Sequence, residues 1–546
     1  MKKYMISVLA PIVCGVGIFA YLLQRSDIFS RFATVLHSSR EQAEITTTSL
    51  DNSKNPLKSP PPFALAKVTA ESLPAVKTYN DAWTGIGPKN FGGKAFDVAV
   101  DPTNANVVYA AYGVGGLWKT NNGGATWLQL NDPSRNNHFA SVHIWRKIPQ
   151  VVFAGLGLPY QSINEEQGIL KSADGGQTWR NLGLSLTGSY AVYRIEADPG
   201  NADVIFAATA NAVYKTTNSG ASWQKVLEYP NPDEWADMPD MVMHPTNPNV
   251  LYVAQPAIGI KMTTDGGATW LDRATGIIAN GKPVLFAISL SHPNRLYAER
   301  MVDWSTIYVY RSDNAGLNWA QVSTLTDYHQ SRYDMAMTVH PTNPDELMIA
   351  NVFHYRSTNA GQTFAWVPHQ AHVDHLRVTY AHSNPQIVYS ANDGGIWKTA
   401  DINDPNQRWQ PADVGVQTNL SFSFGLDPKS DRIYLASGDY HGGFLYQGSI
   451  LWQQFNRGTE WLHYYVEPHE ARKLFYGVDE GKIVLYRTEL GPNGEAIGAE
   501  KRINPDQVSS GYWRRVEFDP QQKGVVYVGP PTGYTNRRTM ATRGRQ

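Results

Sequence analysis

Hydrophobic and polar residues alternate with a period of two in short stretches along most of the chain, and these stretches end alike. An acidic or histidine residue followed by proline closes the stretch, and a second hydrophobic stretch begins after a turn. Val98–Pro102 leading to Val107–Ala110 is one example, and Met241–Pro245 leading to Val250–Val253 is another. Alternation with β-branched residues predicts β-strands. Proline just past a strand end removes no ladder hydrogen bond.

The proline turn recurs through the chain and defines a repeating unit. Beyond the two examples, related turns occur at Pro199, Pro293, Pro341, Pro428, Pro468 and Pro520, with looser versions near Pro149 and Pro385. Together they mark ten units with a mean spacing of about 46 residues.

A second phrase follows most of these units. It reads Ser or Thr, any residue, Asp or Asn, any residue, Gly, any residue, usually Thr or Ser, and then an aromatic; we call it the box. Its seven copies begin at Thr120, Ser172, Thr216, Thr263, Ser312, Ser357 and Thr399, and the last copy lacks the Gly. We expect the Asp or Asn to accept hydrogen bonds from backbone N–H groups one or two residues on. The Gly permits positive φ, and the aromatic is expected to pack between neighbouring sheets.

A turn motif repeated every 40 to 50 residues predicts a β-propeller, an all-β ring of four-stranded sheets called blades. The last unit is short, and Trp83–Gly87 looks like the strand that elsewhere follows a box. This segment could therefore complete the last blade, so the interpretation we favour is a single ten-bladed ring. The alternative is a seven-bladed ring followed by a partial second ring, because the boxes stop after the seventh unit.

Charge and cysteine content narrow the possible partners. The chain has 546 residues and a formal net charge of −1, and its single cysteine is Cys14. Without a basic field we expect no nucleic-acid partner. The repeat region has no disulfide and no thiol chemistry.

The N-terminus reads as a targeting segment. Lys2 and Lys3 precede a mostly apolar run from Tyr4 to Leu23, which is long enough to cross a bilayer. Positive charge before the run favours an exported body. We expect residues 1–25 to be a transmembrane anchor, with a cleaved signal peptide as the alternative. Residues 26–80 read as a Ser/Thr/Pro-rich linker, and residues 81–546 as the propeller.

The boxes resemble the Asp-box (BNR) repeats of sialidases, sortilin-type receptors and xyloglucanases. The stretch from Trp83 to Phe444 is similar to bacterial exported, sortilin-like and sialidase-like repeat proteins. The resemblance implies that the boxes lie on the outer rim, away from a ligand. Sortilin-type propellers have ten blades, whereas xyloglucanases pair two seven-bladed rings.

Polar residues gather in three stretches toward the end of the repeat region. The first contains His369, His372, Asp374 and His375, the second Asn392 and Asp393, and the third Asp439, Tyr440 and His441. Three interpretations of the first stretch remain open: a metal site, a ligand-binding mouth, or side chains that cap turns.

Glycoside hydrolysis needs two carboxylates, one acting as acid and the other as base or nucleophile. The xyloglucanase resemblance implies one catalytic Asp in an Asp-x-Gly-Gly loop after a blade's second strand. Gly113 stands at that place in Tyr112–Gly116. The resemblance implies the other in a Gly-Asp-x-Gly-Gly-Phe context, which Gly438–Phe444 approaches with one inserted residue and which points to Asp439.

A sialidase needs three arginines for the substrate carboxylate. Loose candidates are Arg146, Arg194, Arg332 and Arg377, and the expected Phe/Tyr-Arg-Ile-Pro start is matched only by Tyr193–Glu196, which lacks the Pro.

Two functions follow from these patterns. The interpretation we favour is an exported, membrane-tethered propeller that binds a polysaccharide or an extended peptide at its central mouth. Its contacts would come from His369, His372, His375, Asn392, Tyr440 and His441. The alternative is a glycoside hydrolase that uses Asp439 with Asp393 or Asp374. Neither function requires a cofactor or a metal ion.

Overall fold

The computed structural model describes residues from Gly93 onward, with gaps. The gaps are residues 132–137, 159–167, 187–190, 231–237, 327–333, 369–370, 405, 407–408, 417, 419–420, 428–431, 438–441, 447–452, 458–462, 467–472, 480–482, 491–495, 503–514, 519–520, 523–525 and 530–546. The expected anchor and linker and the segment Trp83–Gly87 therefore lie outside the described residues. Within the described residues, no helix is long and apolar enough to span a membrane.

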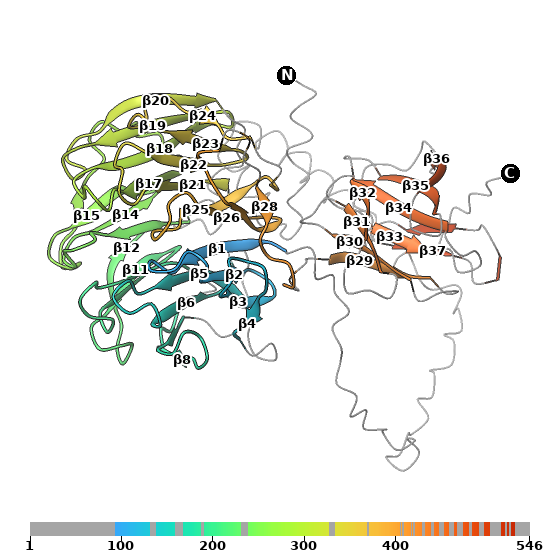
Figure 1. Cartoon of the computed structure of the whole chain (residues 1–546), viewed down its shortest axis with the longest axis horizontal. Helices are drawn as coiled ribbons and strands as arrows, with labels where there is room; N and C mark the ends of the chain where they lie inside the picture. Colours follow the sequence, from blue (N-terminus) through green and yellow to red (C-terminus); the bar gives the residue numbers. More distant parts are fainter. Residues whose placement is uncertain are drawn as a thin grey trace, which may run out of the picture.

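Seven four-stranded antiparallel sheets follow one another along the chain (Figure 1). Blades 1 to 4 are β1 (Ala95–Val100), β2 (Val108–Tyr112), β3 (Gly116–Thr120) and β4 (Leu128–Gln129); β5 (Phe139–Ile144), β6 (Val152–Leu156), β7 (Ile169–Ser172) and β8 (Arg180–Asn181); β9 (Val192–Ala197), β10 (Ile205–Thr209), β11 (Ala212–Thr216) and β12 (Gln224–Glu228); β13 (Asp240–Met243), β14 (Leu251–Gln255), β15 (Gly259–Thr263) and β16 (Leu271–Asp272). Blades 5 to 7 are β17 (Val284–Ile288), β18 (Leu296–Asp303), β19 (Thr306–Ser312) and β20 (Ala320–Thr326); β21 (Ala336–Val339), β22 (Leu347–Ala350), β23 (His354–Ser357) and β24 (Ala365–Trp366); β25 (His375–Tyr380), β26 (Val388–Asn392), β27 (Gly395–Thr399) and β28 (Gln410–Pro411).

Further sheets follow the seventh blade. They are β29 (Ser421–Leu426), β30 (Ile433–Ser437), β31 (Gly442–Tyr446) and β32 (Gln453–Arg457); β33 (His463–Val466), β34 (Lys473–Asp479), β35 (Ile483–Leu490) and β36 (Ala496–Arg502); and the pair β37 (Arg515–Phe518) and β38 (Val526–Gly529). β33 contacts β29 and β30, so the first two of these sheets pack side by side as blades do.

The ring closes between blade 7 and blade 1. Strand β1 contacts β25, β26 and β27, and in Figure 1 it lies beside β25 and β26. The hydrogen bonds at this junction copy those between consecutive blades. The indole N–H of Trp127 donates to the Ala412 carbonyl at 2.7 Å, as that of Trp223 donates to Leu182 at 2.8 Å between blades 3 and 2. The ring is therefore complete after seven blades.

This closure corrects the favoured prediction of a single ten-bladed ring. The ten repeat units exist, but three of them lie beyond the closed ring, as the seven-bladed alternative had it. The spacing of the repeats gives the number of units but does not show which unit packs against the first one. That meeting depends on contacts between residues about 280 positions apart, such as the hydroxyl of Tyr389 donating to Ala105 at 3.0 Å.

The turn after each first strand explains why an acidic residue or a histidine precedes the proline. The Asp101 carboxylate accepts the N–H of Thr103 at 2.8 Å, and the His244 Nδ1 accepts the N–H of Asn247 at 3.2 Å. Aspartate and histidine therefore stabilise the turn in the same way, because each side chain accepts hydrogen bonds from the N–H groups of the turn.

The box forms a closed turn whose hydrogen bonds differ from the expectation. In the copy at Ser172, the Asp174 carboxylate accepts the N–H of Thr178, four residues on, at 2.9 Å. The Ser172 hydroxyl donates to Asp174 at 2.7 Å and accepts the N–H of Gly176 at 2.8 Å. Gly176 has φ 94°, as the sequence predicted. The hydroxyl of the first box residue therefore also holds the turn closed, and the sequence analysis did not predict this role.

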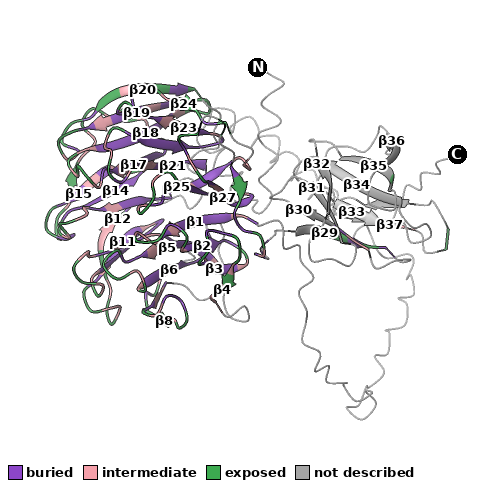
Figure 2. Ribbon diagram, viewed as in Figure 1, coloured by how far each residue is buried: buried purple, intermediate pink, exposed green. Residues whose placement is uncertain are grey.

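The hydrophobic core lies between the blades rather than in one central mass, as the buried stripes in Figure 2 show. Val98 and Val100 of blade 1 pack with Tyr389 and Ala391 of blade 7. Each blade buries both faces against its neighbours, so the apolar positions of every first strand stabilise two blades at once.

Candidate functional site

The ring has two faces with different kinds of connection. The boxes lie with the proline turns on one face, since the N–H of Gly123 in a box donates to Asn106 in a proline turn at 2.8 Å. The opposite face, which we call the loop face, holds the turn between the second and third strands and the connection to the next blade. Of the candidate residues, the structure places His372, Asp374, His375, Asn392 and Asp393 there, in blade 7. His369, Asp439, Tyr440 and His441 lie outside the described residues.

Asp393 is the accessible carboxylate of this group. Its side chain is 16% exposed and lies 3.4 Å from the Lys94 Nζ, which is 20% exposed. Lys94 precedes the first strand of blade 1, so the ion pair crosses the junction at which the ring closes. The Lys94 ammonium also lies over the Phe96 ring at 5.2 Å, which holds the cation beside the carboxylate.

The space that a side chain at Gly113 would occupy holds the Phe96 ring of the neighbouring strand β1. Asp393 and Gly113 occupy the same place in their blades, directly after the second strand. A Cβ atom at Gly113 would overlap the Phe96 ring and touch Leu158, so no acidic side chain fits there without rearrangement. The N–H of Gly113 donates to the Lys94 carbonyl at 3.3 Å. Lys94 therefore contacts both Gly113, where the family resemblance implies an acid, and Asp393, the carboxylate of the adjacent blade.

His375 and Asn392 support the loop that contains Asp393. The His375 Nδ1 lies 2.9 Å from the Ser390 hydroxyl and 3.3 Å from the Asn392 amide, and all three side chains are buried. The Asn392 amide donates to the His372 carbonyl at 3.1 Å, and its oxygen accepts the N–H of Gly394 at 2.9 Å. The two Asn392 contacts fix the backbone on both sides of Asp393.

An aromatic stack lies under this loop. The His354 ring is parallel to the Trp409 indole at 4.3 Å and lies 3.8 Å from the His375 ring. Trp409 is the aromatic of the degenerate seventh box, so the packing between blades 6 and 7 reaches the candidate loop. Asp374 is also buried and has φ 64°, a conformation that shapes the entry into β25. Within the described residues, no group of three or more His, Cys, Asp and Glu could hold a metal ion.

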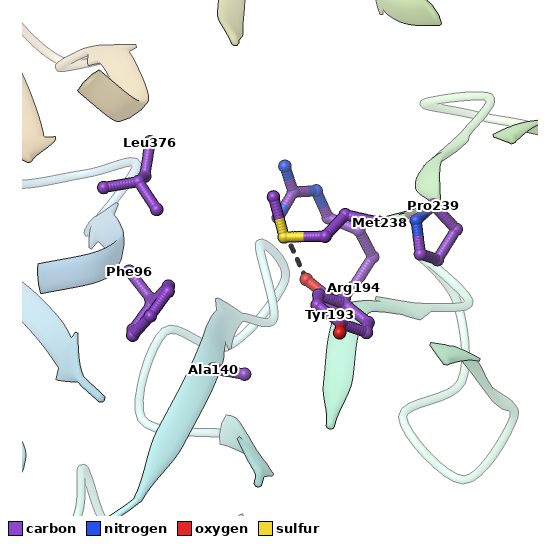
Figure 3. Close-up of a pocket in the computed structure, with 7 residues that line it drawn as sticks. All are labelled: Phe96, Ala140, Tyr193, Arg194, Met238, Pro239 and Leu376. Atoms are coloured by element: carbon purple, nitrogen blue, oxygen red, sulfur yellow. Dashed lines mark hydrogen bonds between the residues drawn. The ribbon is translucent and has the colours of Figure 1, made fainter. Parts of the chain in front are cut away.

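The centre of the ring holds a small cavity (Figure 3). It is lined by side chains near the start of the first strands, namely Phe96, Ala140, Tyr193, Arg194, Met238, Pro239 and Leu376. Its volume of about 20 Å³ gives space for a water molecule, far less than a sugar ring needs. A ligand as large as a sugar ring would therefore lie across the loop face rather than enter this cavity.

Two of the four arginines that the sequence offered for a sialidase, Arg194 and Arg377, pair with carboxylates in the ring, and Arg332 lies outside the described residues. Arg194 lies 2.8 Å from Asp240, and Arg377 lies 3.4 Å from Asp97. The second Asp97 oxygen accepts the N–H of Val142 at 3.0 Å, so this carboxylate ties blades 7, 1 and 2 together. Arginines neutralised in this way do not form a free triad for a substrate carboxylate.

One buried acid at the ring closure, Asp413, was not predicted from the sequence. Asp413 follows blade 7 and is fully buried, and its Oδ2 accepts the N–H of Ile396 at 3.0 Å and the hydroxyl of Tyr112 at 3.2 Å. Burial raises the pKa of Asp413 to about 7, although both hydrogen bonds oppose this. A single carboxylate next to a degenerate box has no pattern that would have singled it out.

Comparison with known proteins points to one group of enzymes. A xyloglucanase of a Paenibacillus species is 25% identical over 247 residues, which are 38% of this chain and 23% of that protein. A xyloglucanase of Hypocrea jecorina is 27% identical over 182 residues, which are 30% of this chain and 21% of that protein. The chain spans about a quarter of the length of these relatives. No family model matches it.

Solved structures agree on the architecture. An ancestral GH74 enzyme aligns with a TM-score of 0.56 at 17% identity, over 82% of this chain and 67% of that one. The GH74 xyloglucanase of Xanthomonas campestris aligns with a TM-score of 0.55 at 14% identity, over 82% of this chain and 85% of that one. At these identities the likeness shows the β-propeller fold. The sequence relatives of the chain are xyloglucanases.

Proposed function

We propose that the protein is a glycoside hydrolase that acts on a xyloglucan-like polysaccharide across the loop face of the ring, with Asp393 as one of its two carboxylates. The observation that supports this most is the position of Asp393. It stands one blade away from Gly113, where the xyloglucanase resemblance implies an acid, and Lys94 contacts both places. The xyloglucanase relatives favour this function over ligand binding alone.

The second carboxylate in this proposal is Asp439. It falls in the connection between β30 and β31, the same connection of its sheet that Asp393 occupies between β26 and β27. Two sheets would thus each supply one acid from equivalent turns. A separation of about 5–5.5 Å between the two carboxyl groups would imply retention of the anomeric configuration, and about 6.5–9.5 Å would imply inversion.

Ligand contacts and location complete the proposal. His372 borders the Asp393 loop and is half-buried, and His369, Tyr440 and His441 belong to the neighbouring connections of the chain. The apolar run from Tyr4 to Leu23 supports export and anchoring at the cell surface. The hydrogen-bonded turns of the boxes support kinship with Asp-box repeats.

Carbohydrate binding without hydrolysis is the second candidate. It is favoured by Phe96, which occupies the space that an acid at Gly113 would need. The two functions differ in turnover and are separated by the same experiment.

The test is a polysaccharide panel that includes xyloglucan, with reducing-sugar release as the readout. Wild type is compared with Asp393→Asn, Asp439→Asn and the matched control Asp272→Asn, whose carboxylate lies on the outer strand β16. We expect each of the first two variants to lose at least about 100-fold in rate and the control to keep wild-type activity. Wild-type protein that binds xyloglucan but releases no sugar would establish the second candidate instead.

A further inference from the structure

The first strand of the eighth sheet, β29, exposes two large apolar side chains that the ring always buries. In each of the seven blades a turn follows the first strand. The residues that stand three positions and one position before the first residue of that turn face the preceding blade, and they are between 1% and 8% exposed. They are Val98 and Val100, Val142 and Ile144, Ile195 and Ala197, Met241 and Met243, Phe286 and Ile288, Met337 and Val339, and Val378 and Tyr380. The equivalent residues of β29 are Phe424, 66% exposed, and Leu426, 59% exposed. We call these two residues the β29 face.

A fixed position on the preceding blade covers this pair inside the ring. It is the residue three after the box aromatic. Leu130 packs with Val142 and Ile144, Leu182 with Ile195 and Ala197, Val226 with Met241 and Met243, and Ala412 with Val98 and Val100. Blade 4 has Arg273 at this position instead.

The N-terminal segment has the same spacing. Ile86 stands three residues after Trp83, as Leu130 stands three after Trp127. Every blade of the ring already has a fourth strand from its own unit, so a strand formed by this segment has no place there.

The segment also enters the described chain at the right place. The N–H of Gly93 donates to the Thr418 hydroxyl at 2.9 Å, three residues before β29 begins. The seven residues from Ile86 to Gly93 span up to roughly 23 Å when extended, and the six from Thr418 to Phe424 up to roughly 20 Å. Ile86 can therefore reach the β29 face without displacing the ring.

We propose that residues 81–92 dock on the β29 face as the fourth strand of a closing sheet, with Ile86 packed against Phe424 and Leu426. The occupant is this segment of the same chain, because it joins the described chain at Gly93, which Thr418 binds three residues before β29. The docking buries two apolar side chains that would otherwise contact water. It also joins the N-terminal segment to the sheet that carries the connection of Asp439.

The test is a cross-link within the full chain. Cys14→Ser removes the natural thiol, and Ile86→Cys with Phe424→Cys supplies the only pair, which is treated with a short bismaleimide. The matched control pairs Ile86→Cys with Leu128→Cys, an exposed apolar position on β4 of the ring. We expect the first pair to form the intramolecular product in at least about tenfold higher yield than the control.

A second experiment tests the same docking by trypsin cleavage and needs no introduced cysteine. Phe424→Ser with Leu426→Ser should speed tryptic cleavage after Lys89 about tenfold or more, while Leu128→Ser leaves it unchanged. Thermal unfolding of the ring should stay the same in both. Equal cross-linking of both cysteine pairs in folded protein would overturn the proposal. A product found only between two differently tagged copies would overturn it in favour of a second copy as the occupant.

Discussion

Replacing Asp413 by asparagine should stabilise the protein at neutral and alkaline pH. Burial raises the pKa of this carboxyl from its ordinary value near 3.8 to about 7. Between these values the folded state holds a proton that the unfolded state has released. The free energy of unfolding therefore falls as the pH rises from about 4 to about 7 and stays at the lower level above that. Asparagine has no charge to bury and removes this loss.

The magnitude follows from the pKa difference and from the hydrogen bonds. A difference of about three pH units corresponds to about 4 kcal/mol. The asparagine oxygen can keep the bonds from Ile396 and Tyr112, as Asn131 accepts the N–H of Leu117 at 2.9 Å in blade 1. The new amide N–H group would take the place of Oδ1, which has no hydrogen-bond partner in the described part of the chain, and leaving it unpaired costs about 1–3 kcal/mol. The net gain at pH 8 is then about 1–3 kcal/mol.

The assay is urea unfolding followed by tryptophan fluorescence at pH 4.5 and at pH 8. We expect Asp413→Asn to exceed wild type at pH 8 and to lose that advantage at pH 4.5, where the carboxyl is protonated in the folded state. Asp272→Asn, at an exposed site, serves as the control and should show no such difference. A variant that is less stable than wild type at pH 8, or a gain that is the same at both pH values, would refute the reasoning.

Three further substitutions test the contacts that hold the ring together, each by urea or thermal unfolding. Ser172→Ala removes the hydrogen bonds that the box hydroxyl makes with Asp174 and Gly176 and should cost about 1–3 kcal/mol; an unchanged midpoint would show that the hydroxyl is dispensable. Trp127→Phe keeps an aromatic ring at this position but loses the bond to Ala412 across the ring closure, and should cost about 1 kcal/mol. A loss of several kcal/mol there would mean that the indole packing matters more than its N–H. Asp97→Ala leaves Arg377 without its carboxylate and frees the N–H groups of two blades, so we expect a loss of about 2–4 kcal/mol, which Asp97→Asn restores in part.

Local patterns predicted the blades well because blades are local structures. The alternating strands, the proline turn at Asp101 and the box at Ser172 each depend on residues within about ten positions, and all appear in the structure. The positive φ of Gly176 and the placement of Trp127 between blades were likewise predicted from single residue types.

The closure of the ring and the surroundings of the candidate acids could not be predicted in this way. Whether unit seven or unit ten meets unit one depends on the fit between distant surfaces, such as Trp127 against Ala412. The pairing of Asp393 with Lys94 depends on that same closure, since the two residues lie at opposite ends of the ring sequence. Sequence therefore identified Asp393 as a candidate, and the fold supplied its cationic neighbour.

The most direct test of the proposed function separates binding from hydrolysis at Asp393. A xyloglucan oligosaccharide is titrated into wild type and Asp393→Asn by calorimetry, and turnover of the same sugar is measured in parallel. The account predicts that the variant keeps its affinity within about threefold while its rate falls at least about 100-fold. Equal turnover in both proteins, or binding by wild type with no turnover at all, would contradict a catalytic role for Asp393.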